Sequence, residues 1–205
     1  MSIELDHIFW MVPKDEVARV VAKLSALGLK ESYRRQHRGQ GTSNICYCFE
    51  NAFLEILWLE DEAEARSPAI ERTKLADRAL GNANPFGIAW RGDANVPVWD
   101  FKPPYLPEGV SIPMAVASDD ADLPLLFSFP GSKPPSEMPP ERHGGMQKEA
   151  GFERLEITRL QCSDTHIMNP LSIKMEPVFK VEKGLPSMTL KLAGQQRHAV
   201  LDLPF

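Results

Sequence analysis

Glu55 stands in the apolar segment 53–57 (FLEIL), whose pattern predicts a buried carboxylate. Taking an ionised carboxylate out of water is costly unless a cation or a strong hydrogen-bond donor satisfies it. The sequence allows two kinds of partner for Glu55. A bound cation would make Glu55 part of a functional site, whereas an arginine of the basic run 33–38, such as Arg34 or Arg35, would satisfy it without function.

A glycine-rich turn at 39–44 (GQGTSN) precedes this segment. Its two glycines allow close backbone approach and leave the Gln, Thr and Asn side chains free to contact a ligand. The turn is therefore either a plain strand connection or the rim of a pocket. The candidate substrate contacts are His37, Gln40, Gly41, Asn44 and Trp58, although His37 also fits a surface position and strand tryptophans usually belong to a core.

The first sixty residues predict a βαβββ unit that would position these side chains. A strand at 5–12 ends at Pro13, and the apolar spacing from Val17 to Leu27 is typical of an amphipathic helix closed by Gly28. Strand-like segments follow at 31–36, 44–49 and 52–59, with turn residues between them.

Beyond this unit, Ser67 and Pro68 predict the start of a helix over 67–80. Four short strands are expected at 86–90, 96–101, 110–116 and 123–129. Five prolines within 130–140 favour an extended connector. The remainder predicts a strand at 152–162, a short helix near 169–174, and strands at 178–182, 187–192 and 197–203, a weaker copy of the first unit.

Three segments in order along the chain, 5–8 (LDHI), 37–44 (HRGQGTSN) and 53–57 (FLEIL), resemble the glyoxalase-like branch of the vicinal-oxygen-chelate (VOC) superfamily. The resemblance implies an α+β fold in which paired βαβββ modules form a curved mixed sheet with a concave cup. It divides the chain into a glyoxalase-like region at 1–130, a Pro-rich connector at 131–151 and a degenerate third module at 152–205. The first region holds module 1 at about 3–60, the connecting helix at 67–80 and a strand-rich module at 86–130.

The same resemblance implies a metal site. Metal-dependent members carry a His on the first strand and a Glu on the fourth strand of a module, and His7 and Glu55 match those positions. A neutral imidazole and a carboxylate suit zinc, nickel, manganese or iron. The second module departs from the pattern, because Gly87 stands where a His is expected and 125–129 has no carboxylate. His143, Glu156 or Asp202 could supply further ligands, and His7 could also be a structural histidine.

Two function classes follow. The first is a divalent-metal-assisted lyase, isomerase or dioxygenase acting on a small oxygen-bearing molecule, with Glu55 as the catalytic residue that carries a proton. The second is a metal-free protein that binds a small molecule in the apolar cup for sequestration or sensing. No Gly-x-Ser-x-Gly elbow, Walker loop or dinucleotide fingerprint is present in the sequence.

The composition limits the classes of binding partner that we expect. The formal net charge of -5, with both signs mixed along the chain, favours neither nucleic acid nor an anionic membrane. No apolar stretch is long enough to span a bilayer, so we expect a cytoplasmic protein whose partner is a small molecule, with a homodimer left open. Three cysteines fit no disulfide framework.

Overall fold

The structure is a computed structural model that describes residues 2–129 and 131–204. Pro130, the first proline of the expected connector, lies outside these residues.

Module 1 has the expected order. Strand β1 (Ile3–Met11) leads through a 3-10 turn (Lys14–Glu16) into helix α1 (Val17–Ala26), and β2 (Tyr33–His37), β3 (Thr42–Cys48) and β4 (Phe53–Leu59) follow. The strands lie in the order β2-β3-β4-β1, with β1 parallel to β4 and the other pairs antiparallel. This order makes β1 and β4, which carry His7 and Glu55, direct neighbours.

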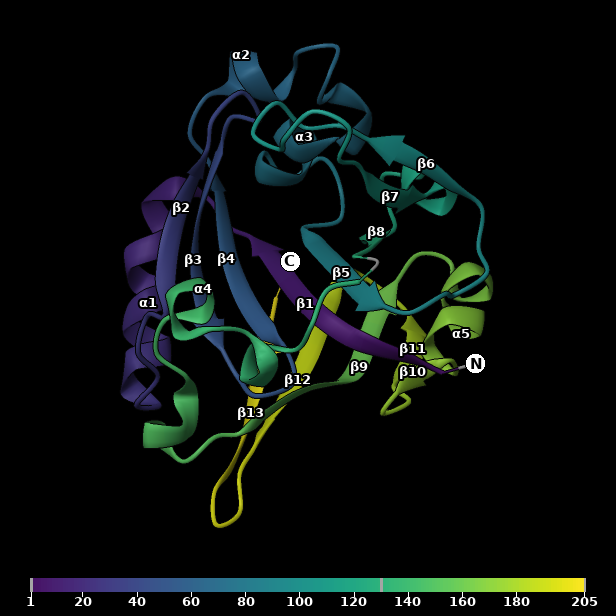
Figure 1. The fold of residues 1–205 in the computed structure, drawn as a ribbon. Coiled ribbons are helices and arrows are strands. Elements are labelled where there is room, and N and C mark those ends of the chain that lie inside the picture. The colour runs from purple at the N-terminus through teal and green to yellow at the C-terminus, as the bar shows by residue number, and fades with distance from the viewer. Residues whose placement is uncertain (1, 130, 205) are drawn as a thin grey trace.

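Module 2 repeats the strand pattern without the helix. It consists of β5 (Phe86–Arg91), β6 (Val98–Phe101), β7 (Ile112–Ala115) and β8 (Leu125–Ser128), with a 3-10 helix at Val116–Asp119. The order is β5-β8-β7-β6, and β5 is parallel to β8. Antiparallel pairing of β1 with β5 joins the two modules into one curved sheet (Figure 1). The expected α+β fold class with paired modules is confirmed.

The single helix expected over 67–80 is replaced by short pieces. These are α2 (Glu62–Ala65), a 3-10 helix (Glu71–Thr73) and α3 (Leu75–Ala79). Lys74 between the last two adopts the left-handed conformation, with φ of 57°, which ends a helical run. The buried Arg78 guanidinium also donates to the carbonyls of Thr73, Asn84 and Leu123. These tertiary contacts override the helical sequence pattern of the segment.

The connector contains only short helices: two 3-10 turns (Pro135–Glu137 and Gln147–Ala150) and α4 (Pro140–His143). The C-terminal part then forms its own four-stranded sheet. Its elements are β9 (Arg154–Cys162), α5 (Thr165–Ser172), β10 (Met175–Glu176), β11 (Lys180–Lys183), β12 (Ser187–Ala193) and β13 (His198–Leu203).

This second sheet has the order β11-β9-β12-β13, and β11 runs parallel beside β9, whereas β10 pairs with β1. In module 1 the strand after the helix takes the far edge instead. The segment 152–205 therefore differs from the third βαβββ copy that the sequence favoured, and it does not extend the cup.

Alternation along the strands creates two apolar layers. Ile8, Leu54 and Ile56 face the convex side, where they belong to one core with residues of α1 and the second sheet. Phe9 and Leu57 face the concave side, in a separate cluster with module 2 residues such as Phe127. No helix in the described ranges has both the length and the hydropathy to cross a membrane. The concave side, open between the modules, holds the candidate site.

Candidate active site

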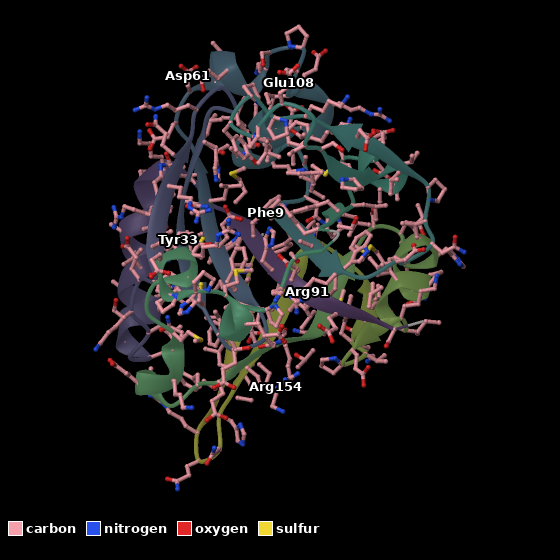
Figure 2. The ribbon with its side chains drawn as sticks, viewed as in Figure 1. Phe9, Tyr33, Asp61, Arg91, Glu108 and Arg154 are labelled. Atoms are coloured by element: carbon pink, nitrogen blue, oxygen red, sulfur yellow. The ribbon has the colours of Figure 1, made fainter. Side chains whose placement is uncertain are left out.

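A cavity of about 560 Å³ occupies the concave side of the sheet. Its two walls differ in chemistry. Module 1 and the connector supply most of the polar lining, which includes Asp6, His7, Tyr33, Arg35, His37, Gln40, Asn44, Glu55, Ser132 and Arg142, while Thr73 and Tyr105 add hydroxyl groups from other segments. The opposite wall is apolar and includes Phe101, Leu106, Ile112, Met114, Leu125, Phe127 and Phe129. Such a cavity suits a molecule with an apolar body and a polar end. Phe9 of β1, which also lines the cavity, is labelled in Figure 2.

A β-bulge brings two neighbouring side chains of β1 to this cavity. The pairing of β1 with β5 shifts between Leu5 and His7, so Asp6 has no partner on β5. Consecutive side chains of a regular strand point to opposite faces, and a bulge breaks that rule. Here Asp6 and His7 both line the cavity, and His7 Nδ1 lies 2.7 Å from Asp6 Oδ1. This contact makes Nδ1 the donor, so the neutral ring presents the Nε2 lone pair to the cavity.

The His7 ring is also fixed by aromatic contacts. It stacks on Phe53 with centroids 4.4 Å apart and an interplanar angle of 12°, and it meets the edge of Phe127 at 5.2 Å. Its Nε2 lies 3.9 Å from Glu55 Oε2. That separation exceeds hydrogen-bond length, and a ligand atom placed to one side of the line joining the two atoms, about 3 Å from each, can contact both. His7 and Glu55 are each 6% exposed, which shields their charges from bulk water.

Glu55 is satisfied by an amide rather than by an arginine. Asn44 Nδ2 donates to Glu55 Oε1 at 2.5 Å, while Asn44 Oδ1 accepts from the Arg35 backbone N–H at 2.9 Å. The same Nδ2 lies 3.4 Å from His37 Nε2. Asn44 therefore orients the carboxylate and leaves Oε2 directed toward His7. Arg34, one of the two arginines considered as a partner, pairs with Glu31 instead.

The titratable groups of the cavity respond to burial and to their partners. Burial would raise the pKa of Asp6, but His7, Ser132 and Arg91 together hold that pKa below its usual value. Burial lowers the pKa of His37, even though the negative charge of Glu55 opposes the shift. Burial raises the pKa of Tyr33. At neutral pH, Asp6 is thus ionised, His37 is neutral and the Tyr33 phenol keeps its proton.

Asp6 also links the two modules to the connector. Arg91 of β5 contacts Asp6 Oδ2 at 3.1 Å and donates to the carbonyl of Asn51 at 2.8 Å. The Ser132 hydroxyl donates to the same Asp6 oxygen at 2.5 Å. Figure 2 shows Arg91 close to the β1 ribbon. The Asp6 carboxylate is therefore both a partner of His7 and a structural junction.

The glycine-rich turn combines the two roles considered for it. Glu64 accepts hydrogen bonds from the backbone N–H groups of Gly39 and Gly41, and a β-carbon on Gly41 would lie 2.1 Å from the Asp61 carbonyl oxygen. Gly41 therefore shapes the turn and does not line the cavity. Gln40 does line it, and its amide donates to Thr42 Oγ1 at 2.8 Å.

Other candidates from the sequence lie elsewhere. Trp58 faces the convex core, because it stands an odd number of residues from Glu55 on the same strand, and its indole N–H donates to Glu60 at 2.6 Å. His143 is buried in the connector outside the cavity lining. Glu156 and Asp202 belong to the second sheet, on β9 and β13. The structure thus brings His7, His37, Gln40, Asn44 and Glu55 together in one cavity. The other four candidates, which are Trp58, His143, Glu156 and Asp202, do not line that cavity.

The described residues around His7 and Glu55 do not fit a resident metal ion. The pair supplies two donors, and module 2 would have to supply the others. Ala89 pairs with His7 across the sheet, Phe127 pairs with Ala89, and neither carries a donor atom. A metal-binding side chain does not fit at position 87 in this packing, because a β-carbon added to Gly87 would lie 2.0 Å from the Phe9 ring. No group of three or more His, Cys, Asp or Glu side chains with metal-binding geometry occurs in the described part of the chain.

Sequence reasoning missed several lining residues. Asp6 was visible as the neighbour of His7, but only the bulge turns it toward the cavity. Arg142 and Ser132 reach the site because of the path of the connector, for which the local sequence carries no signal. The apolar wall of module 2 could have been inferred from the alternation in 125–129 once the modules were paired.

One protein family matches part of the chain by sequence. Residues 5–95 match the sequence model of the family described as a glyoxalase-like domain. No curated protein matches the sequence. Solved structures with a similar fold include a hypothetical protein from Staphylococcus aureus, with 12% identity, a TM-score of 0.49 and coverage of 98% of this chain and 86% of that one.

Two further structures align over a smaller part of the chain. A hypothetical protein from Bacillus halodurans has 16% identity and a TM-score of 0.46, with coverage of 65% of this chain and 97% of that one. Methylmalonyl-CoA epimerase from Mycobacterium tuberculosis has 16% identity and a TM-score of 0.43, with coverage of 63% and 88%. The family match spans β1 to β5 and includes both His7 and Glu55. The chain carries a glyoxalase-like domain over residues 5–95.

Proposed function

We propose that this protein is an enzyme that transfers a proton on a small oxygen-bearing molecule, as an isomerase or a lyase does, using His7 and Glu55. The observation that carries the proposal is the 3.9 Å gap between His7 Nε2 and Glu55 Oε2 at the polar end of an otherwise apolar cavity. Two groups that can each gain or lose a proton face the same point in space. A reacting atom placed there lies within reach of both.

The surroundings assign a role to each group. Asp6 accepts a hydrogen bond from His7 Nδ1–H. It can therefore stabilise the positive charge that the ring acquires when Nε2 takes a proton from the substrate. Asn44 holds one oxygen of Glu55 and leaves the other free to exchange a proton with the same substrate. The net step moves one proton between two substrate atoms through His7 and Glu55, without loss or gain of electrons.

The apolar wall supports this chemistry by placing the body of the substrate. Phe127 meets the His7 ring edge, and Phe9 and Leu125 continue the surface away from it. A bound apolar group would displace water from the gap. Electrostatic interactions of the substrate with His7 and Glu55 become stronger when water is excluded.

Deuterium incorporation tests the proposal across whole classes of compound. The protein is incubated in D₂O with medium-length alkyl and aryl ketones, hydroxyketones and oxo acids, and exchange at carbon is followed by NMR. We expect enzyme-dependent exchange in at least one compound class, and a fall of about a hundredfold or more in His7→Asn and in Glu55→Gln. The matched control is Trp58→Phe on the convex face, which should exchange at the wild-type rate.

A second candidate is a binding protein without turnover, which the extent of the apolar wall favours. Both candidates predict binding of an apolar probe. They differ in the response to His7→Asn, which leaves a pure binder able to hold its ligand. Saturable binding of a compound that shows no exchange, with the same affinity in wild type and His7→Asn, would favour the binder and contradict the enzyme.

A further inference from the structure

We infer that Arg35 and Arg142 form an anion subsite at the mouth of the cavity, and that the ligand is an amphipathic molecule whose carboxylate, sulfonate or phosphate group is separate from its reactive end. The position of the reactive end rests on the proposed function. The anion preference stands on separate observations and is tested separately.

The first observation is that these two arginines lack the partners that other cavity charges have. Asp6 is paired with Arg91, and Glu55 accepts from Asn44. Within residues 2–129 and 131–204, neither Arg35 nor Arg142 forms an ion pair or a side-chain hydrogen bond, although both line the cavity. The cavity therefore holds two uncompensated guanidinium groups in a protein whose overall formal charge is negative.

The second observation is that Arg35 is already positioned. Its guanidinium lies over the ring of Tyr33, with Cζ 4.5 Å from the ring centroid. This stacking leaves the N–H edge of the guanidinium free, because a cation–π contact uses only its flat face. Figure 2 shows Tyr33 beside the strands of module 1. An anion at the mouth can therefore bind without first ordering this side chain.

The third observation is that the connector brings Arg142 to the same cavity. The connector is anchored to module 1 on either side of Arg142, because Ser132 donates to Asp6 and Gln147 exchanges two hydrogen bonds with the backbone of Lys30. Between these anchors the connector with α4 crosses module 1 and contributes Met138 and Arg142 to the lining (Figure 1). The side chains of Arg142 and Arg35 are both exposed, so an anion can reach them from solvent.

The strand order places the anion subsite apart from the reactive gap. That gap lies between β1 and β4, and β2, which carries Arg35, lies two strands beyond β4 in the order β2-β3-β4-β1. Adjacent strands are about 4.8 Å apart, so the β2 backbone lies about 10 Å from the β4 backbone. The anionic group of the ligand and its reactive end are therefore different parts of the molecule.

A pair of fluorescent probes tests the subsite. Anilinonaphthalene sulfonate carries an anion, and N-phenylnaphthylamine has the same ring systems without it. We expect wild type to bind the sulfonate more tightly than the neutral probe, with the difference shrinking as salt rises. Arg35→Met and Arg142→Met should each reduce sulfonate affinity about fivefold while leaving the neutral probe unchanged. Arg35→Lys and Arg142→Lys, which keep the charge, should restore part of the preference.

Arg38→Met is the matched control, because Arg38 is an exposed arginine just after β2 that does not line the cavity. It should bind both probes as wild type does. Unchanged neutral-probe binding in the arginine variants shows that the cavity is still folded. Three results overturn the inference: no sulfonate preference in wild type, equal loss of both probes, or an equal loss of sulfonate affinity in Arg38→Met.

These outcomes are separable from those of the proposed function. A sulfonate preference with no deuterium exchange in any compound retains the subsite and contradicts the enzyme. Exchange without a sulfonate preference retains the enzyme and contradicts the subsite. Among exchanging compounds, those with an anion remote from the carbonyl should show the lower KM, and Arg35→Met should raise that KM about fivefold with little effect on kcat.

Discussion

Replacing Gly87 by alanine tests how tightly the two modules are packed at the floor of the cavity. Gly87 pairs with Phe9 between β1 and β5. A β-carbon at this position would lie 2.0, 2.3 and 2.5 Å from three atoms of the Phe9 ring, whereas ordinary contacts are 3.4 to 4 Å. The ring must therefore withdraw by about 1.5 Å, and the open direction is into the cavity.

The expected destabilisation follows from that displacement. Overpacking of a core typically costs about 1 to 3 kcal/mol, and alanine recovers about 0.5 to 1 kcal/mol of backbone entropy relative to glycine. We expect Gly87→Ala to lower the free energy of unfolding by about 1 to 2 kcal/mol. Affinity for N-phenylnaphthylamine should fall as well, because the displaced ring occupies volume that the probe needs.

Urea unfolding followed by tryptophan fluorescence measures this loss. Gly145→Ala is the control, because nothing lies within 4 Å of its β-carbon. Phe9→Leu in the Gly87→Ala background should recover part of the stability, since leucine lacks the outer ring atoms, and the coupling is read from the double-mutant cycle. Equal stability of Gly87→Ala and Gly145→Ala, with no coupling to Phe9→Leu, would refute the packing argument.

Three further predictions concern the polar wall. Asp6→Asn should destabilise the protein by about 2 to 4 kcal/mol at neutral pH, because Arg91 loses its buried charged partner and keeps the exposed Glu4 at 3.4 Å. The pKa of Asp6 is lowered in the folded protein, so the stability difference between wild type and Asp6→Asn should be full above the usual aspartate pKa and should vanish as pH falls through the folded pKa. A stability difference that does not change with pH in urea unfolding would contradict this prediction. Asn44→Ala should cost about 1 to 3 kcal/mol by leaving the Glu55 carboxylate without its donor, and Glu55→Gln in that background should reduce the loss. Trp58→Phe should leave the affinity for both naphthalene probes unchanged, and a severalfold change in fluorescence titration would contradict its placement on the convex face.

The sequence predicted the parts of the site that depend on strand periodicity. Alternation in 5–12 and 52–59 placed His7 and Glu55 on strands, and the observed pairing of β1 with β4 makes those strands neighbours. The contact between Asn44 and Glu55 follows from the same sheet. The alternation of apolar and polar residues along a strand involves only residues close in sequence, so it could be recognised without knowledge of tertiary contacts.

Features that depend on distant contacts were not predictable in this way. The 67–80 segment has a helical pattern, but carbonyls from three separate segments bind the Arg78 guanidinium and the helix breaks at Lys74. The segment 152–205 resembles a third module in the order of its elements. Their pairing differs, and element order alone does not determine strand pairing.

The central claim is that the chain's own residues, His7 and Glu55, carry the proton. The most direct measurement compares deuterium exchange before and after exhaustive chelation, together with the metal content of the protein. We predict the same exchange rate in both samples and metal far below one equivalent, because His7 and Glu55 supply two donors and no group of three or more His, Cys, Asp or Glu side chains among the described residues could hold an ion. Loss of exchange on chelation, with recovery on adding a stoichiometric divalent ion, would contradict the account.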